Sequence, residues 1–385
     1  MNIFVSLRQK FSHYSINGKI VTVIWITLVW TLIALFRFFE TYSSIVSTEG
    51  QEYTLKLSDG IIASLVIIIP VGLIVGSSLV FIWERWLRKM AYQKAMFYIL
   101  LFYSAVFFIF YPLDYMWKTV NNSNELIDNS FLKTVLKNIL NLTLLSNYIF
   151  WFVITFLTIL FLFIRDKFGP TTFINFLKGK YLRPKREERI FMFMDLKSST
   201  TIAERLGEEH YFNFLNDTFS IATPGILSTK GEIYQYVGDE IVISWLTENG
   251  VNRANCISCF YKMTALLKNK SDYFDQKYNV QPQFKAGLHF GHVITGEMGI
   301  IKREIVYSGD VLNTASRIQS LCNEMNTDIL ISNNLMKQID LAFLDKKFKY
   351  VGNITLRGKQ QKIELVTLDL QQKTGQKEQK KVTLK

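Results

Sequence analysis

Two aspartates, Asp195 and Asp239, occupy positions where carboxylates can act together. Asp195 closes the apolar run at residues 190–194, and Asp239 lies in the turn at 238–240 between two further apolar runs. The ends of neighbouring strands meet at one edge of a sheet, so we predict that the two carboxylates converge. Paired carboxylates can hold two Mg²⁺ or Mn²⁺ ions about 3.5–4 Å apart for phosphoryl or nucleotidyl transfer. Either aspartate alone would more simply be a helix cap or a turn residue.

The residues after Asp195 are candidates for phosphate binding. Lys197, Ser198, Ser199 and Thr200 introduce a predicted helix, with a capped start at 198–200. The first N–H groups of a helix have no partner within it, and together with the helix dipole they attract anions.

A third candidate is the pair Asn313 and Arg317, an amide and a guanidinium four residues apart on one face of a predicted helix at 311–322. A fixed guanidinium can stabilise the charge that develops on a phosphorus centre. Taken alone, such a pair is more often a surface feature.

Alternating strand and helix patterns predict an α/β domain that positions these residues. Residues 284–290 and 293–298 are predicted to form a hairpin around Gly291, with His289 and His292 as its side chains. Cys256 and Cys259 lie on a predicted helix without a second cysteine pair, so we do not expect a zinc site there. The predicted strands are 190–194, 233–237, 241–245, 284–290, 293–298, 304–307, 328–331, 346–352 and 362–369, and the predicted helices are 198–228 with a break near Gly207, 250–269 and 311–322.

The first half of the chain is predicted to be a membrane domain. Four apolar runs, at about 20–39, 61–83, 96–117 and 147–164, have the length of membrane-spanning helices. No ionisable residue lies in mid-span, which argues against a transporter. The segment 131–144 is amphipathic and predicts a helix on the membrane surface, with a sensory or re-entrant segment as the alternatives.

The distribution of Lys and Arg predicts the orientation in the cell (plasma or inner) membrane. Fifteen of them lie in 1–19, 84–95 and 165–189, against four in the alternate loops. Positive loops stay in the cytoplasm, so both termini are predicted to be cytoplasmic. The net charge of +12 fits nucleic acid, an anionic lipid surface or a phosphate-rich ligand. The basic segment 181–189 lacks the aromatic platform of single-strand nucleic-acid binders, so contact with lipid is favoured there. The expected division is 1–168 membrane domain, 169–186 connector, 187–370 catalytic domain and 371–385 basic tail.

Three blocks of the sequence resemble the signatures of the class III adenylate/guanylate cyclases: residues 193–196, 236–240 and 309–317. The preceding membrane module is similar to that of bacterial cyclases with four transmembrane helices. The resemblance implies a ferredoxin-like α/β (α+β) catalytic domain that works as a head-to-tail homodimer, with Asp195 and Asp239 binding two metal ions. It also implies that the partner chain supplies Asn313 and Arg317, and that Arg357 or Lys359 binds the triphosphate.

The residues at the two base-reading positions, Gln235 and Val306, depart from the family pattern. Adenylate cyclases usually carry Lys and Asp or Thr there, and guanylate cyclases carry Glu and Cys. We predict an adenylate cyclase that converts ATP to 3′,5′-cyclic AMP and pyrophosphate. The alternatives are a cyclase for GTP or another nucleotide, a diguanylate cyclase, and a catalytically silent membrane receptor with a cyclase-like domain. What the membrane domain binds is not indicated by the sequence.

Overall fold

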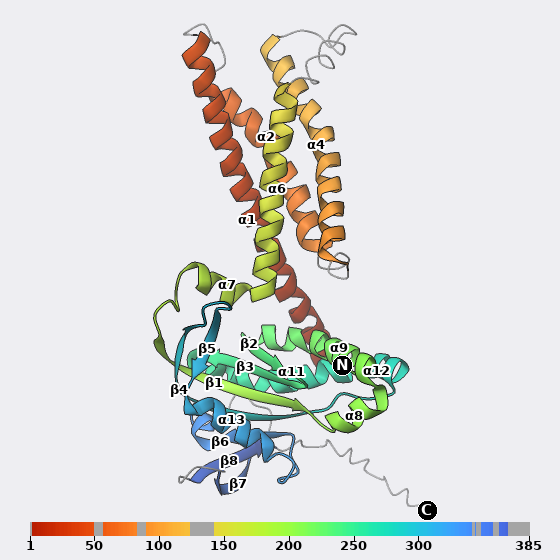
Figure 1. Cartoon of the computed structure of the whole chain (residues 1–385), viewed down its shortest axis with the longest axis vertical. Coiled ribbons are helices and arrows are strands. Elements are labelled where there is room, and N and C mark those ends of the chain that lie inside the picture. The colour runs from red at the N-terminus through yellow and green to blue at the C-terminus, as the bar shows by residue number, and fades with distance from the viewer. Residues whose placement is uncertain are drawn as a thin grey trace, which may run out of the picture. The chain divides into compact units, whose positions relative to one another are not determined.

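The structure is a computed structural model that describes residues 2–49, 57–82, 90–123, 142–340, 343, 348–356 and 362–368 (Figure 1). It divides into two compact units, Met1–Phe173 and Ile174–Lys385. The predicted surface helix at 131–144 falls mostly outside the described residues. The predicted tail at 371–385 and the triphosphate candidates Arg357 and Lys359 also lie outside them.

The first unit consists of helices that pack against one another along the chain order, α1 with α2, α2 with α4, and α4 with α6. Pro70 lies inside α2 without ending it, and the helix continues into a π-helical turn. The elements are α1 (Asn2–Glu49), α2 (Leu57–Ser77), the π-helix η2 (Ser78–Ile82), α4 (Tyr92–Ser123) and α6 (Leu142–Phe168).

Polar side chains join these helices at a few points. The indole Nε1 of Trp30 on α1 donates to Thr158 Oγ1 on α6 at 3.1 Å. The hydroxyls of Ser104 on α4 and Tyr148 on α6 lie 2.8 Å apart. Hydrogen bonds between membrane helices add to van der Waals packing, which is the main force where the surroundings are as apolar as the helices.

The outer surface of the first unit is apolar. Large side chains such as Trp25, Phe36 and Phe97 are more than half exposed, in positions where a soluble protein would place polar residues. Within the part of the chain that the structure describes, four helical segments are long and apolar enough to cross a membrane: Gly18–Ser44, Gly60–Ile82, Gln93–Pro112 and Leu142–Lys167. They coincide closely with the four runs expected from the sequence.

The second unit is built on a mixed sheet with strand order β2-β3-β1-β4-β6-β8-β7. Among the described strands only β4 and β6 pair in parallel, and β5 pairs with the far end of β4. The βαββαβ succession with order β2-β3-β1-β4 is the ferredoxin-like arrangement that was expected. The strands are β1 (Lys185–Leu196), β2 (Glu232–Val237), β3 (Glu240–Leu246), β4 (Phe284–Met298), β5 (Glu304–Ser308), β6 (Ile329–Ser332), β7 (Phe348–Thr355) and β8 (Lys362–Leu368).

Helices cover this sheet (Figure 1). The predicted break near Gly207 is confirmed, because α8 ends there and α9 begins. The helix predicted at 250–269 corresponds to α11, which begins five residues later, at Asn255. Helix α12 was not predicted. The helices are α7 (Pro170–Leu177), α8 (Ser199–Leu206), α9 (Glu208–Ser228), α10 (Thr247–Val251), the 3₁₀ turn η4 (Asn252–Ala254), α11 (Asn255–Lys268), α12 (Ser271–Tyr278), α13 (Asp310–Ser320) and α14 (Asn333–Met336).

Strand β1 separates two cores. Ile190, Met192 and Met194 point into the larger core, which is shared with α9 and α11. Phe191 and Phe193 point to the opposite face, where they pack with the apolar side of α13. Successive side chains of a strand alternate between faces, so the next residue after Met194 is directed to the α13 side. That residue is Asp195.

The hairpin predicted around Gly291 is wrong. Strand β4 runs without interruption from Phe284 to Met298, and Gly291 pairs with Arg189 in its middle. The glycine is needed for close packing rather than for a turn, since a Cβ there would lie 2.7 Å from Val311 Cγ2. His289 and His292 are therefore strand residues, and His289 Nδ1 lies 2.8 Å from Ser332 Oγ.

Cys256 and Cys259 lie on α11 as free, fully buried thiols in the larger core. Burial raises the pKa of both thiols to about 12. A thiol with so high a pKa is neither a reactive nucleophile nor a ready metal ligand, so these two residues act as packing side chains.

Candidate active site

Three charged residues form a row across neighbouring strands on the α13 face of the sheet. Asp195 at the end of β1 pairs directly with Glu240 on β3 and with Lys285 on β4. Cross-strand partners project to the same face with their side chains adjacent. The Nζ of Lys285 lies 3.2 Å from Asp195 Oδ2, and both side chains are largely shielded from solvent.

Asp239 lies in the hairpin between β2 and β3, as predicted. Val237 pairs with Glu240, which leaves Gly238 and Asp239 as a two-residue turn. Gly238 has φ of 61°, a backbone conformation that glycine adopts at no steric cost. The exposed turn brings Asp239 next to the row, because Glu240 is its chain neighbour and pairs with Asp195.

The pKa shifts indicate that these carboxylates are close together. Burial raises the pKa of Asp195; the Lys285 ammonium opposes this, and the Asp239 carboxylate raises the pKa further. Burial, and then Asp195 and Asp239, raise the pKa of Glu240 to about 7. Tyr211 on α9 is also affected, since burial and then both aspartates raise its pKa. The site thus concentrates negative charge that Lys285 only partly balances.

Helix α13 closes the site from the other side. The side-chain amide of Gln319, on the buried side of the helix, donates to Asp195 Oδ2 at 3.2 Å. The helix approaches β4 very closely at Gly287, where a Cβ would lie 2.2 Å from the backbone nitrogen of Gln319. The absence of a side chain at Gly287 is therefore what allows Gln319 to reach Asp195.

Asn313 and Arg317 project from α13 away from its buried side. Asn313 is exposed and Arg317 is half-buried, whereas Thr314 and Ala315 between them are buried. Among the residues that the structure describes, no carboxylate forms an ion pair with Arg317. The single chain thus directs Gln319 toward the aspartates and leaves the amide and guanidinium on a surface.

Of the predicted phosphate-binding residues, Lys197 is already engaged within the chain. Its backbone N–H donates to Gln283 O at 2.8 Å, and its ammonium pairs with Asp328. Ser198 is the N-cap residue of α8 in a left-handed conformation, but its hydroxyl makes no capping bond, contrary to the predicted cap. Ser199 and Thr200 begin the helix, and their role in phosphate binding stays a prediction.

Gln235 and Val306 lie on different strands. Gln235 is exposed on β2, and Val306 is half-buried on β5. β2 pairs with β3, whereas β5 pairs with β4, so the two residues are not sheet neighbours. Their assignment to base reading is carried by the family resemblance alone.

Sequence reasoning missed Lys285, Gln319 and Glu240. Lys285 is the one charged residue in the otherwise apolar or small strand 284–288, and Gln319 is a polar residue on the buried stripe of an amphipathic helix. The sequence shows both of these polar residues in otherwise apolar patterns. It does not show that both contact Asp195, because that depends on which strands pair.

Comparison with known proteins decides the family. The sequence model for the adenylate and guanylate cyclase catalytic domain matches residues 183–369. Residues 183–369 are a class III adenylate/guanylate cyclase catalytic domain. Every described strand of the sheet, from β1 to β8, therefore lies within the cyclase domain, and so does the row of charged residues.

Several curated proteins are similar to this chain. Adenylate cyclase 2 of Rhizobium meliloti (strain 1021) is 32% identical over 205 residues, covering 53% of this chain and 56% of that protein. Adenylate cyclase of Anabaena cylindrica is 24% identical, covering 49% and 40%. The receptor-type guanylate cyclase gcy-13 of Caenorhabditis elegans is 24% identical, covering 47% and 18%. The chain thus spans about half the length, or less, of these curated relatives.

Solved structures are also similar to the chain. A bacterial light-regulated adenylyl cyclase is 19% identical, covering 60% of this chain and 66% of that one, with a TM-score of 0.48. The guanylyl cyclase Cya2 is 19% identical, covering 48% and 92%, with a TM-score of 0.41.

The close approach of α13 to β4 gives a first prediction. Gly287→Ala is expected to lower the free energy of unfolding by about 1–3 kcal/mol, because the new Cβ overlaps helix backbone that cannot move aside cheaply. The measurement is denaturant or thermal unfolding of the purified protein. Gly296→Ala on the same strand is the matched control, since a Cβ there is 3.4 Å from the nearest atom. Equal stability of the two variants would contradict the tight packing.

Proposed function

We propose that the chain is a membrane-anchored adenylate cyclase that converts ATP to 3′,5′-cyclic AMP and pyrophosphate. In this reaction the ribose 3′-oxygen attacks the α-phosphorus and pyrophosphate leaves. The observation that carries the proposal is the convergence of Asp195 and Asp239 within a cyclase domain. The test is mass spectrometry of the products that the purified chain forms from each of the four nucleoside triphosphates with Mg²⁺ or Mn²⁺. Absence of any cyclic nucleotide would favour a silent membrane receptor.

The acidic residues fit divalent cations. Hard cations such as Mg²⁺ prefer carboxylate oxygens. Burial and then repulsion between the carboxylates raise the pKa of Asp195 and Glu240, and added positive charge would relieve that repulsion. Asp195 and Asp239 would hold two such ions, which polarise the phosphate oxygens and neutralise the charge that develops on them. Lys285 and Gln319 keep Asp195 in position through contacts to its Oδ2.

We further propose that the site is shared by two copies of the chain. Asn313 and Arg317 face outward from α13, which suits residues that act on a nucleotide held by the partner's aspartates. In that role the amide of Asn313 orients the ribose, and the guanidinium of Arg317 stabilises charge at the α-phosphorus.

Lys and Arg are concentrated in 1–19, 84–95 and 165–189, and this supports a cytoplasmic location for both termini and for the cyclase domain. The substrate ATP and the product cyclic AMP would then share one compartment with downstream effectors, as intracellular signalling requires.

We expect ATP to be preferred over GTP by a factor of about ten, equal to about 1.4 kcal/mol. Gln235 can donate to and accept from the adenine edge at once, whereas guanine has three polar edge atoms and Val306 can pair with none. A desolvated polar atom without a partner costs about 1–3 kcal/mol. The measurement is kcat/KM for each nucleotide with the purified chain.

The matched variant for base selection is Gln235→Leu, which is expected to remove the preference by lowering kcat/KM for ATP toward that for GTP. Its control is Tyr236→Phe, the neighbouring exposed position on β2, which keeps the aromatic ring. Equal or greater kcat/KM for GTP in the unaltered chain would contradict the preference and leave the cyclase proposal standing.

A further inference from the structure

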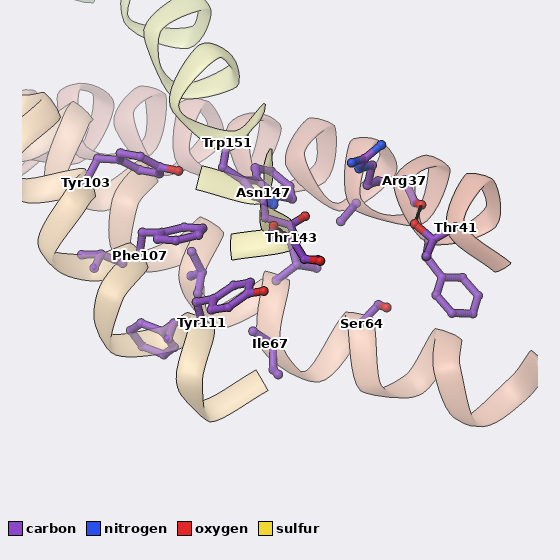
Figure 2. Close-up of a pocket in the computed structure, with 16 residues that line it drawn as sticks. Arg37, Thr41, Ser64, Ile67, Tyr103, Phe107, Tyr111, Thr143, Asn147 and Trp151 are labelled. Atoms are coloured by element: carbon purple, nitrogen blue, oxygen red, sulfur yellow. Dashed lines mark hydrogen bonds between the residues drawn. The ribbon is translucent and has the colours of Figure 1, made fainter. Parts of the chain in front are cut away.

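A cavity of about 380 Å³ lies between the helices of the membrane unit (Figure 2). Its walls come from the second half of the α1 span, the first half of α2, the second half of the α4 span and the first turns of α6. These four segments lie at one end of the bundle, opposite the end of α6 that carries Arg165 and Lys167. In the proposed orientation this end faces away from the cytoplasm. The volume lies in the roughly 300–1,000 Å³ range of small-molecule sites.

The lining combines apolar walls with a few polar groups, as ligand sites do. Tyr103, Phe107 and Tyr111 project from α4 toward Asn147 and Trp151 of α6, with Ile67 on α2 nearby (Figure 2). Aromatic rings give large contact area at little cost in side-chain entropy. This part of the cavity suits an apolar, preferably aromatic, body.

Arg37 supplies positive charge to the cavity. Among the described residues that line the cavity, it is the only one with a full charge, and none is acidic. Its guanidinium lies 5.1 Å from the centre of the Phe150 ring. Its present carboxylate partner is Glu40, one helical turn away at 2.7 Å. An incoming carboxylate would compete with Glu40 for the same guanidinium.

The neighbouring hydroxyls present hydrogen-bond acceptors rather than donors. Thr41 donates its proton to Arg37 O, and Ser64 donates to Gly60 O, each within its own helix. The amide of Asn147 donates to Thr143 O at 2.9 Å and keeps a second N–H. The donors that remain for an anionic group of a ligand are therefore the guanidinium of Arg37 and the second N–H of Asn147.

We infer that this cavity binds a small carboxylic acid with an apolar, aromatic or alkyl body. The carboxylate would replace Glu40 on Arg37, and the body would lie against the rings of α4 and α6. An ammonium ligand would meet the positive charge of Arg37 in a cavity whose described lining holds no acidic residue, and a neutral ligand would gain only a weaker hydrogen bond from the guanidinium. The inference concerns binding by the membrane unit and does not depend on the proposed cyclase activity.

The test uses the full chain in phosphatidylcholine nanodiscs and a series of ω-phenylalkanoates, from 3-phenylpropionate to 6-phenylhexanoate, each beside its primary amide. Binding is followed by the fluorescence of the tryptophans, of which Trp151 lines the cavity, and by thermal stabilisation. At least one acid is expected to saturate, and to bind about tenfold more tightly than its amide, equal to about 1.4 kcal/mol. If no acid saturates, or acid and amide bind equally, the inference is overturned.

Two substitutions with opposite expected signs separate recognition from general damage. Arg37→Gln should weaken binding of the acid about tenfold and leave the amide unchanged, since a charge-assisted hydrogen bond is lost. Glu40→Gln should tighten binding of the acid, because the competing carboxylate is gone. Arg165→Gln, the same change at the other end of the unit, is the control. Ala34→Leu, which fills the cavity, should abolish binding of both compounds. A failure of Arg37→Gln and Glu40→Gln to move the affinity in opposite directions overturns the inference.

Discussion

Replacing Asp195 or Asp239 by Asn is expected to lower the rate of cyclic nucleotide formation by at least about 100-fold, the scale of losing a main electrostatic stabiliser. The amide keeps the shape of the carboxylate but not its charge. The remaining carboxylates would then be more fully balanced by Lys285 and would attract divalent cations less strongly. The measurement is the initial rate of product formation by the purified full chain over a range of Mg²⁺ and Mn²⁺ concentrations.

The control for these variants is Asp272→Asn, an exposed carboxylate on α12. Its rate should stay within twofold of the unaltered chain, roughly the small effect expected for surface substitutions. Both site variants should stay folded, as thermal unfolding would show, because Asp195 lies near a strand end and Asp239 is a half-buried turn residue, and neither belongs to the apolar cores. Near-normal turnover in either site variant would contradict the metal assignment.

Mixing two inactive variants is expected to restore activity. Asp195→Asn and Arg317→Ala should each be inactive alone, since every site of either homodimer lacks one part. Co-expressed at equal levels, half of the dimers would be heterodimers with one intact site of two. About a quarter of the unaltered activity should therefore return, by the symmetry of a two-fold interface. The measurement is the rate of the purified mixture, with differently tagged chains to count heterodimers.

The matched control for this experiment is Asp195→Asn mixed with Asp239→Asn. Both aspartates belong to the same half-site, so no heterodimer of these two variants has an intact site and no activity should return. If the first mixture stays inactive while heterodimers are present, the site is not shared between chains. If the control mixture also recovers, the two aspartates do not act at one site of one chain.

Local sequence patterns were sufficient for most elements of the cyclase domain. The apolar run at 190–194 identified the buried part of β1, which extends from Lys185 to Leu196, and the glycine at 207 separates α8 from α9 as expected. The two-residue turn at Gly238 and Asp239 followed from its composition. These features depend on backbone preferences of neighbouring residues, so they can be read without knowledge of the fold.

Gly291 shows where local reading fails. A glycine between two apolar runs has the pattern of a turn, yet Gly291 lies inside β4. A side chain at this position would collide with Val311 of α13, which explains why the residue is a glycine. The same is true of Gly287, whose missing side chain admits the backbone of α13. A glycine required by a distant helix and a glycine required by a turn look alike in the sequence. Only long-range packing distinguishes them.

The sequence by itself determined the four candidate membrane helices, most strands and helices of the cyclase domain, and the positions of Asp195 near a strand end and of Asp239 in a turn, because each depends on residues close in the chain. Tertiary structure alone decided that Lys285 and Gln319 meet Asp195, from strands and a helix that are 90 and 124 residues away in sequence. It also decided that Arg37 faces a cavity walled by four helices. Such long-range contacts depend on which strands and helices pack together. That packing is set by the burial of their apolar faces rather than by any local sequence pattern.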